Sequence, residues 1–508
     1  MPDALSRPNP LFDLLCWRRP VSGRRAAALA AVVLAVSFVL FPQSFAADGT
    51  VVPDDHAVIS LDLAMVRAFC GRASFYSHAG RVAADLQADM SRRDIPLRQL
   101  VTERAGSVRE YCDQAVWPRV NNENSLMLLE AALLRVRPDL SLKGVGQWLH
   151  AIRIVMVAVF VLALLWLGAS VWFAMGTMVI GLIVLNAMPT FVYSVYPFLF
   201  VLVLILAAAY GLLLSRPPST LIGWLAAAVG LGALSSFTVN MRTSYLPVAA
   251  MFLLSFLAAL WWLRRDGSWG SRPGRRTLLV IAGFLAGYLA FQWGFITRHF
   301  APDERGGAAH SVMHPLVLAL GVPETEFSRE LGVRWEDRVG PEKARAIDPD
   351  TDYLGPRYNA ALKTFYRELW QTRTWDMVQV YRNKFSTAGT EMLTVLRSSP
   401  GPVGAVIAAV LAPLDWLVQV MWLAVFCLVL AVAMLLLFVR RRSIVFFVFG
   451  LLSLAACLLQ VESGIVYSKF VQQYHNFASF FVLFISLAGV QAFVNYTCSR
   501  FRVVDTGA

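Results

Sequence analysis

Three carboxylates stand at the starts of apolar helical stretches, where they can act on a substrate at a membrane surface. Asp54 and Asp55 open one such stretch, and Glu123 precedes the apolar helix predicted over 126–136. The free N–H groups and the dipole at a helix start stabilise anions there. A neighbouring asparagine can simply cap the second helix, but a cap does not account for Glu123. A carboxylate within hydrogen-bond reach of a hydroxyl can remove its proton as a general base.

Cationic side chains recur at the ends of later apolar stretches. Arg242 and Arg298 each follow such a stretch, and Lys469 and His475 lie between the last two of them. Lys469 is also near Glu462, in a region where a charge is costly unless it is paired or used. Cations of this kind neutralise the charge that develops on a departing phosphate. Acids from the first third of the chain and cations from its later part are therefore expected to share one cavity.

The elements that position these residues are membrane helices. Of 508 residues, 57% are hydrophobic and only 15% are charged, whereas soluble domains carry about 25% charged residues. A helix needs about 20 apolar residues to cross a bilayer. Ten stretches qualify, at 26–46, 152–168, 171–187, 196–213, 220–238, 245–263, 277–296, 417–438, 444–461 and 476–496. The predicted fold class is an all-α polytopic membrane protein with about ten transmembrane helices and two large helical extracytoplasmic loops.

The charge distribution predicts the orientation. Segments 1–25, 214–219, 264–276, 439–443 and 497–508 together hold 16 Arg and 4 Asp, which equals the whole net charge of +12. By the positive-inside rule these segments are cytoplasmic, both termini included. Topology and anionic lipids account for the arginines, so no nucleic-acid partner is expected.

This orientation divides the chain into seven regions. The boundaries are a cytoplasmic N-terminus 1–25, a first transmembrane helix 26–46, an extracytoplasmic helical loop 47–150 with the candidate acids, transmembrane helices 2–7 in 151–296, a second extracytoplasmic loop with an interfacial helix in 297–416, transmembrane helices 8–10 in 417–496, and a cytoplasmic tail 497–508. The first span is interpreted as an uncleaved anchor, with a cleaved signal peptide as the alternative. The second and third spans form a tight hairpin at 167–170, and the short stretch 403–414 is interpreted as interfacial or re-entrant.

Cys70 and Cys112 are the only cysteines in the two hydrophilic loops. An oxidising compartment would join them in a disulfide. Spacing alone leaves two buried free thiols as the alternative.

No metal site is predicted, although two sequence patterns have the spacing of metal ligands. His310 and His314 lie four residues apart and can meet on one helix face, but no carboxylate or cysteine accompanies them at ligand spacing. Asp350-Thr351-Asp352 has an acid spacing that binds divalent ions, but an acidic loop that caps a helix explains it better. An amphipathic helix is predicted to follow over about 356–385. A divalent cation stays open as a cofactor.

The order of these motifs resembles the GT-C membrane glycosyltransferases, especially the branch of protein mannosyltransferases and lipid A aminoarabinose transferases. Pro53-Asp54-Asp55-His56 stands where that branch has Asp-Glu, and Trp117-Pro118-Arg119 to Glu123 stands where it has a Pro-Arg stretch and a second Glu. Arg153 matches its Arg at the second span. Tyr467-Ser468-Lys469-Phe470, followed by the apolar run 477–489, is similar to its Arg-Tyr and last span.

The resemblance implies an inverting hexosyl- or pentosyltransferase in the inner (cytoplasmic) membrane of a bacterium, with a polyprenyl-phosphate sugar donor and an envelope glycan, lipid or protein acceptor. Asp55 would be the base with Asp54 as alternate, and Glu123 would orient substrate or a metal. Arg242, Arg298, Lys469 and His475 would bind the donor phosphate, with membrane lipids around them. The alternatives are an enzyme like the O-antigen ligases and polymerases, or a non-catalytic transporter or structural protein of the envelope.

Overall fold

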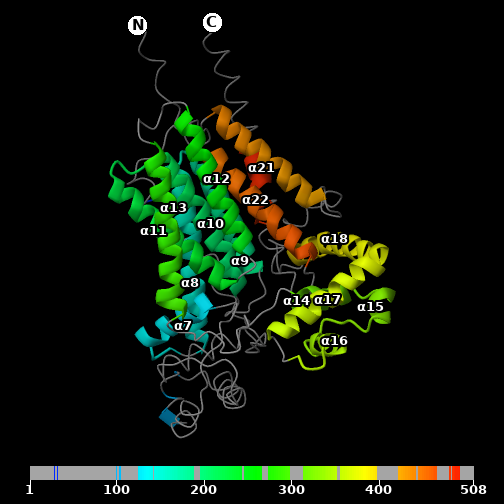
Figure 1. The fold of residues 1–508 in the computed structure, drawn as a ribbon. Helices are drawn as coiled ribbons and strands as arrows, with labels where there is room; N and C mark the ends of the chain where they lie inside the picture. The colour runs from blue at the N-terminus through cyan, green and yellow to red at the C-terminus, as the bar shows by residue number, and fades with distance from the viewer. Residues whose placement is uncertain are drawn as a thin grey trace, which may run out of the picture.

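Every regular element in the described part of the chain is a helix (Figure 1). The computed structural model describes residues 124–140, 142–187, 195–242, 245–265, 273–297, 313–351, 355–397, 422–441, 444–465, 480–481 and 483–491, with isolated positions 28, 31, 96, 99, 102 and 103. Apart from the isolated positions 28 and 31, the predicted first span lies outside these residues, as does the stretch 403–414.

In the described part of the chain, eight apolar helices build a bundle, and six of them are long and apolar enough to cross a membrane. These six are α8 (Leu142–Trp166), α10 (Val195–Ser215), α11 (Leu221–Met241), α12 (Leu246–Arg265), α13 (Pro273–Phe291) and α22 (Ile444–Ile465). Two shorter apolar helices are α9 (Val171–Ala187) and α21 (Trp422–Arg441). Residues 480–481 and 483–491 are also helical. The described part of the chain is thus all-helical, and its apolar helices indicate a membrane protein.

The predicted hairpin is present as two helices. α8 ends at Trp166 and α9 begins at Val171. Gly168 has a φ of 95°, and residues that carry a Cβ rarely adopt this backbone conformation. The hydroxyl of Ser170 then accepts the N–H of Phe173 and donates to Gln491 at 2.6 Å, which ties the start of α9 to the last helical stretch. A glycine at the turn therefore lets two apolar helices pack back to back.

α10 is the central helix of the bundle. It packs against α8, α11, α12 and α22, and most of its residues are buried. Phenylalanines fill the space beside it, with edge-on ring contacts such as Phe200 with Phe480 at 5.0 Å between centroids. Such geometry adds to the burial of the rings. The core of the bundle is thus aromatic and aliphatic, as a helix surrounded by other helices requires.

α11 and α13 approach each other at backbone distance. Gly232 on α11 faces the backbone of Phe284 and Tyr288, and Gly287 on α13 faces the backbone of Val229. Gly283 and Gly287 are four residues apart, the small-residue spacing that lets membrane helices pack closely. The two helices therefore form one rigid pair, which continues into a π-helical segment, η2 (Gln292–Thr297).

Six helical elements in the described residues 313–351 and 355–397 form a subdomain beside one end of the bundle. They are α14 (Met313–Leu318), η3 (Ala319–Gly321), α15 (Glu326–Glu330), α16 (Val339–Ile347), α17 (Pro356–Thr372) and α18 (Thr374–Arg397). Their own core contains Leu320, Leu369 and Met377. Figure 1 shows this subdomain and α7 (Asn124–Val136) at the same end of the bundle, called here the α7 end. The opposite end, where α10 ends and α11 begins, is called the Arg216 end.

The prediction of a single amphipathic helix over 356–385 is wrong in one respect, because the structure has two helices that meet at Arg373. α17 ends there, and α18 starts at the next residue in a new direction. The Arg373 guanidinium donates two hydrogen bonds of 3.0 Å to Glu330 and one of 2.6 Å to Asp376. Its hydrogen bonds hold the pKa of Glu330 below its usual range. The change of direction between α17 and α18 is therefore stabilised by the side-chain hydrogen bonds of Arg373, and no glycine or proline lies there.

Gly232→Ala is expected to destabilise the protein, because the added Cβ would overlap the Phe284 carbonyl and push α11 away from α13. Overpacking of this kind costs about 1–3 kcal/mol. The apparent melting temperature in detergent should therefore fall by several degrees. Gly230→Ala, two residues earlier on the same helix, is the matched control because a Cβ there meets open space. Equal melting temperatures for the two variants would contradict the close helix contact.

Candidate functional site

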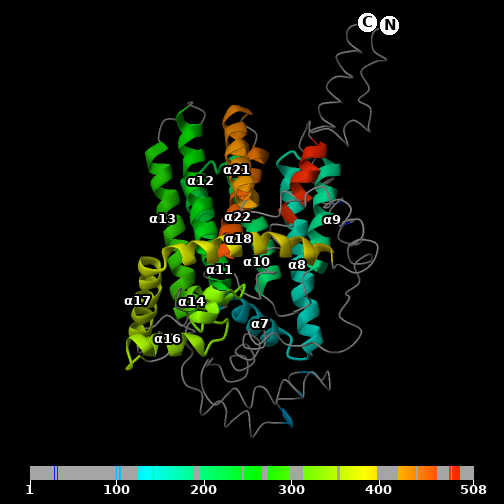
Figure 2. The same ribbon diagram turned by 90° about the vertical axis from the view of Figure 1, so that its right-hand side faces the viewer.

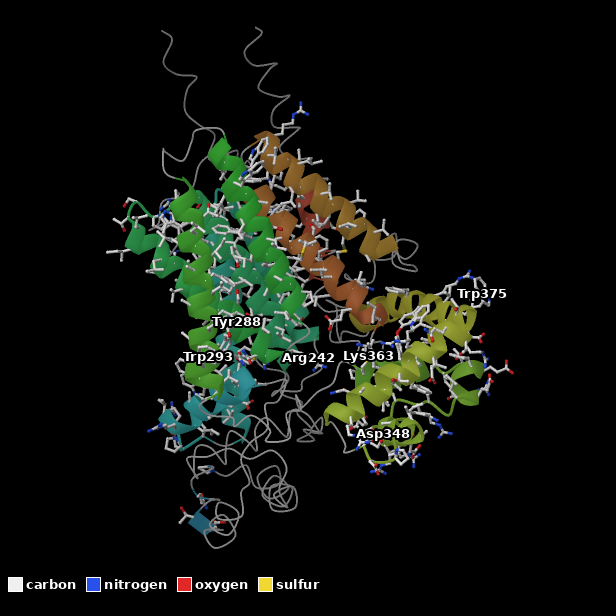
Figure 3. All side chains as sticks on the ribbon, viewed as in Figure 1. Arg242, Tyr288, Trp293, Asp348, Lys363 and Trp375 are labelled. Carbon is white, nitrogen blue, oxygen red and sulfur yellow. The ribbon has the colours of Figure 1, made fainter. Side chains whose placement is uncertain are left out.

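Arg242 is the one predicted site residue whose structure is described. Asp54, Asp55, Glu123, Arg298, Lys469 and His475 lie outside the described residues, as do Cys70 and Cys112 of the predicted disulfide. Figure 3 places Arg242 at the α7 end of the bundle. Its backbone ends α11: the Arg242 N–H donates to Thr238 at 3.4 Å, and its carbonyl accepts from Tyr245 at 3.0 Å. Its half-buried side chain is thereby presented at the end of the helix pair α11 and α13.

A polar bridge precedes Arg242 on α11. The side-chain amide of Asn240 donates to the side-chain oxygen Oε1 of Gln292 at 2.8 Å and also to the backbone carbonyl of Ser236. Gln292 is the first residue of the π-helical segment η2, and segments of this kind are frequent at functional sites. Trp293 follows, with 65% of its surface exposed, and Figure 3 shows it and Tyr288 along α13 and η2. The bridge fixes the end of α11 and hence the position of Arg242.

A buried acid and a buried arginine meet at the same end. Glu130 on α7 is fully buried, and Arg153 on α8 is 4% exposed. The two charges lie close enough to interact, and the Arg153 guanidinium also stands 4.4 Å from the centre of the Phe198 ring on α10. Ions buried this deeply need a partner, because losing water costs several kcal/mol per ion. This attraction supports the packing of α7 against α8.

Sequence analysis missed Glu130. The available signal was a lone carboxylate in the middle of the apolar helix NSLMLLEAALLRV. The sequence indicates Arg153 only as the Arg of the second span, and the structure places its side chain inside the bundle. An isolated acid on a predicted apolar helix indicates a buried partner of opposite charge.

α7 brings these groups into one region. It packs against both α8 and α11, and α11 ends at Arg242. The region therefore holds one carboxylate, two guanidinium groups and an amide bridge, all carried by helices. Rigid elements of this kind can hold an anionic group of a ligand at a fixed distance from the bundle. This grouping at the α7 end is the candidate functional site.

A second polar cluster lies inside the subdomain. Nδ1 of His314 is 2.5 Å from the Tyr358 hydroxyl, and Nε2 is 3.3 Å from Asp337. With its proton on Nε2, the imidazole donates to Asp337 and accepts from Tyr358. Gly340 of α16 lies directly against this pair, so that a Cβ there would overlap both side chains. Tyr358 is fully buried, and the cluster therefore joins α14, α16 and α17 rather than meeting a ligand.

The histidines and aspartates with the spacing of metal ligands bind other side chains wherever the structure describes them. His314 is engaged as above, and His310 lies outside the described residues. Asp348 accepts two hydrogen bonds of 2.9 Å from Arg357, which also lies 3.8 Å from Asp350. Within the described ranges, no three His, Cys, Asp or Glu side chains gather as metal ligands. The acidic loop is thus closed by an arginine at the start of α17.

Lys384 attaches the subdomain to the bundle. α18 crosses the bundle sideways at the end of α22 (Figure 2), and the two helices are in contact. The fully buried Lys384 amine donates to the Ile465 carbonyl at 3.1 Å and lies over the Tyr381 ring. Next to it, Gly464 leaves room for the Phe385 ring. Burial lowers the pKa of Lys384 to about 7, because the ammonium form loses its hydration.

Lys384 should make the stability of the protein depend on pH. Between pH 7 and its usual pKa of 10.5 the unfolded chain binds more protons than the folded one, so stability rises with pH across that window. We expect Lys384→Met to lose most of this rise, measured as the apparent melting temperature at the two ends of the window. Lys363→Met is the control, because Lys363 is exposed on α17 (Figure 3). An unchanged pH dependence in Lys384→Met would contradict the buried amine.

Comparisons of the chain with protein-family models, with curated proteins and with solved structures found no match. The chemistry of the α7 end therefore has to be argued from its own residues. Their types and their arrangement on α7, α8 and α11 describe a cation-bearing site at the end of a membrane bundle.

Proposed function

We propose that the protein is a GT-C-like membrane glycosyltransferase that moves a sugar from a polyprenyl-phosphate donor to an envelope glycan, lipid or protein acceptor. The sequence motifs that resemble this family are the first support. The observation that carries the proposal further is the arrangement at the α7 end. There, the helix that directly follows Glu123 in the sequence packs against α11, which ends at Arg242.

The charges at this end suit a phosphate-bearing donor. Arg242 lies at the end of α11, where a lipid-linked phosphate can approach from the membrane, and the more deeply buried Arg153 lies midway along α8. Glu130 interacts with Arg153, so the candidates for binding the donor phosphate are Arg242 and the cationic residues beyond the described residues. Guanidinium groups bind phosphate oxygens with paired hydrogen bonds, which hold the leaving group in one orientation.

In the proposed reaction, Asp55 removes the proton of the acceptor hydroxyl, with Asp54 as the alternate base. The acceptor oxygen attacks the anomeric carbon from the face opposite the donor phosphate, and the bond between that carbon and the phosphate oxygen breaks. Its electron pair leaves with the polyprenyl phosphate. Arg242, Arg298, Lys469 and His475 are proposed to stabilise this anion. Glu123 is proposed to orient the substrate or a divalent cation.

The same proposal includes ten spans, with the α7 end and the subdomain outside the inner membrane of a bacterium. Arg216 and Arg440 are exposed at the Arg216 end, which by the positive-inside rule supports a cytoplasmic position for that end and for both termini. Exposed Trp261 and Trp293 lie near opposite ends of the bundle, as interfacial aromatic residues do. α9, α21 and the helical residues 480–491 would then cross with the six longer helices.

Asp55→Asn is expected to abolish transfer while leaving expression and thermal stability unchanged. Loss of a general base lowers turnover by about 100-fold or more. The measurement is the release of polyprenyl phosphate from a set of polyprenyl-phosphate hexoses and pentoses, one sugar at a time, by the full chain in membrane vesicles.

The control for this experiment is Asp139→Asn, which removes an exposed carboxylate that accepts two hydrogen bonds from Arg137 in the turn after α7. It should keep full transfer. Full activity in Asp55→Asn would remove Asp55 from the mechanism. Failure of the unaltered protein to release polyprenyl phosphate from any sugar in the set would contradict the proposed function itself.

A further inference from the structure

A hollow of about 410 Å³ opens on the bundle surface at the Arg216 end, far from the α7 end. Its walls are formed by Ala209 to Leu213 of α10 with Arg216 just beyond the end of that helix, and by Ala227 to Leu234 of α11; Trp166 of α8 closes one side. Each wall covers eight residues, so the hollow extends about 10 Å along the bundle. Its volume lies in the range of about 300–1,000 Å³ that small-molecule pockets occupy. It thus runs parallel to the direction of the lipid chains.

One charge stands at the mouth of this apolar hollow. Arg216 is the single ionisable residue among those that line it, one residue beyond the candidate span Phe198–Ser215. Its guanidinium lies 4.9 Å from the centre of the Trp166 ring. Tryptophan and arginine at the end of a span belong to the headgroup level of a bilayer. The hollow therefore begins at the headgroups and continues among the acyl chains.

We infer that this hollow binds one acyl chain of an anionic phospholipid, whose headgroup phosphate is held by Arg216. An apolar channel with a cation at its headgroup end matches such a lipid in both polarity and charge. A helix of a partner protein would find no complementary acid here, because the other lining residues are apolar or aromatic. The inference rests on the membrane bundle and is independent of sugar transfer.

Gly230 provides a direct way to fill the hollow. It lines the hollow on α11 and is exposed, and a Cβ at this position would meet no other atom. A leucine at this position would therefore occupy the space of the acyl chain without displacing a neighbouring helix. This differs from Gly232, where any side chain would overlap α13.

The experiment is native mass spectrometry of the full chain, delipidated and then titrated with phosphatidylglycerol or with phosphatidylcholine of the same chains. The unaltered protein should bind its first phosphatidylglycerol more tightly than phosphatidylcholine. Arg216→Gln should reduce this preference by about fivefold, the contribution of one basic residue near an anionic headgroup. Arg216→Lys should retain most of it. Gly230→Leu should weaken the first binding step for both lipids.

Two matched variants separate a built site from general attraction. Arg440→Gln removes another exposed arginine near the same end, on α21, and should leave the preference unchanged. Gly489→Leu adds the same side chain at an exposed helical glycine with open space and should leave binding unchanged. If Arg440→Gln lowers the preference as much as Arg216→Gln does, or if Gly230→Leu binds like the unaltered protein, the inference is wrong.

Discussion

The opposite charges of Glu130 and Arg153, enclosed together at the α7 end, are the interaction on which the arrangement of this protein depends. Both side chains are almost fully buried among apolar helices, where either charge alone would lose its hydration without compensation. Their attraction joins α7, which follows the acidic motif in the sequence, to α8, which belongs to the bundle. Together with Leu126, Ala131 and Leu134 of its apolar face, which pack into the core of the bundle, this attraction holds α7 beside the end of α11.

The remaining parts of the α7 end are held by contacts that leave little freedom. α11 and α13 touch at Gly232 and Gly287, so the last turn of α11 cannot move without α13. The bridge between Asn240 and Gln292 then sets the direction of the chain at Arg242. On the other side of this end, α18 is attached to α22 through Lys384. The proposed donor site would therefore lie between a rigid helix pair and a subdomain that is fastened to the bundle.

Much of the helical layout could be predicted from the sequence, because apolar runs of membrane length have few alternatives to helix in a bilayer. The bounds of α10, α11 and α12 differ from the predicted spans by one to three residues. The turn at Gly168 was also predictable, since a short stretch that contains Gly168, Ala169 and Ser170 separates two apolar runs. Six helices in the described ranges meet the length and hydropathy of a span, and the ten-span topology stays a prediction.

What could not be predicted depends on residues far apart in the sequence. The corner at Arg373 arises from Glu330, 43 residues earlier, and no local breaker marks it. The contact of His314 with Tyr358 joins residues 44 apart, which gives a buried structural cluster where the sequence indicated a weak metal motif. Glu130 looked like one polar residue on an apolar helix, and only its proximity to Arg153 explains it. The acids 54, 55 and 123 lie outside the described residues, so their roles stay predictions.

A double-mutant cycle on Glu130 and Arg153 tests the central claim most directly. Glu130→Gln, Arg153→Met and the double variant would each be purified in detergent and their apparent unfolding free energies compared. Each single change leaves a buried charge without its partner and should cost about 3–5 kcal/mol, whereas the double variant should cost much less than the two together. Additive losses would show that the two charges do not interact, and α7 would then lack the contact that places it at the end of α11.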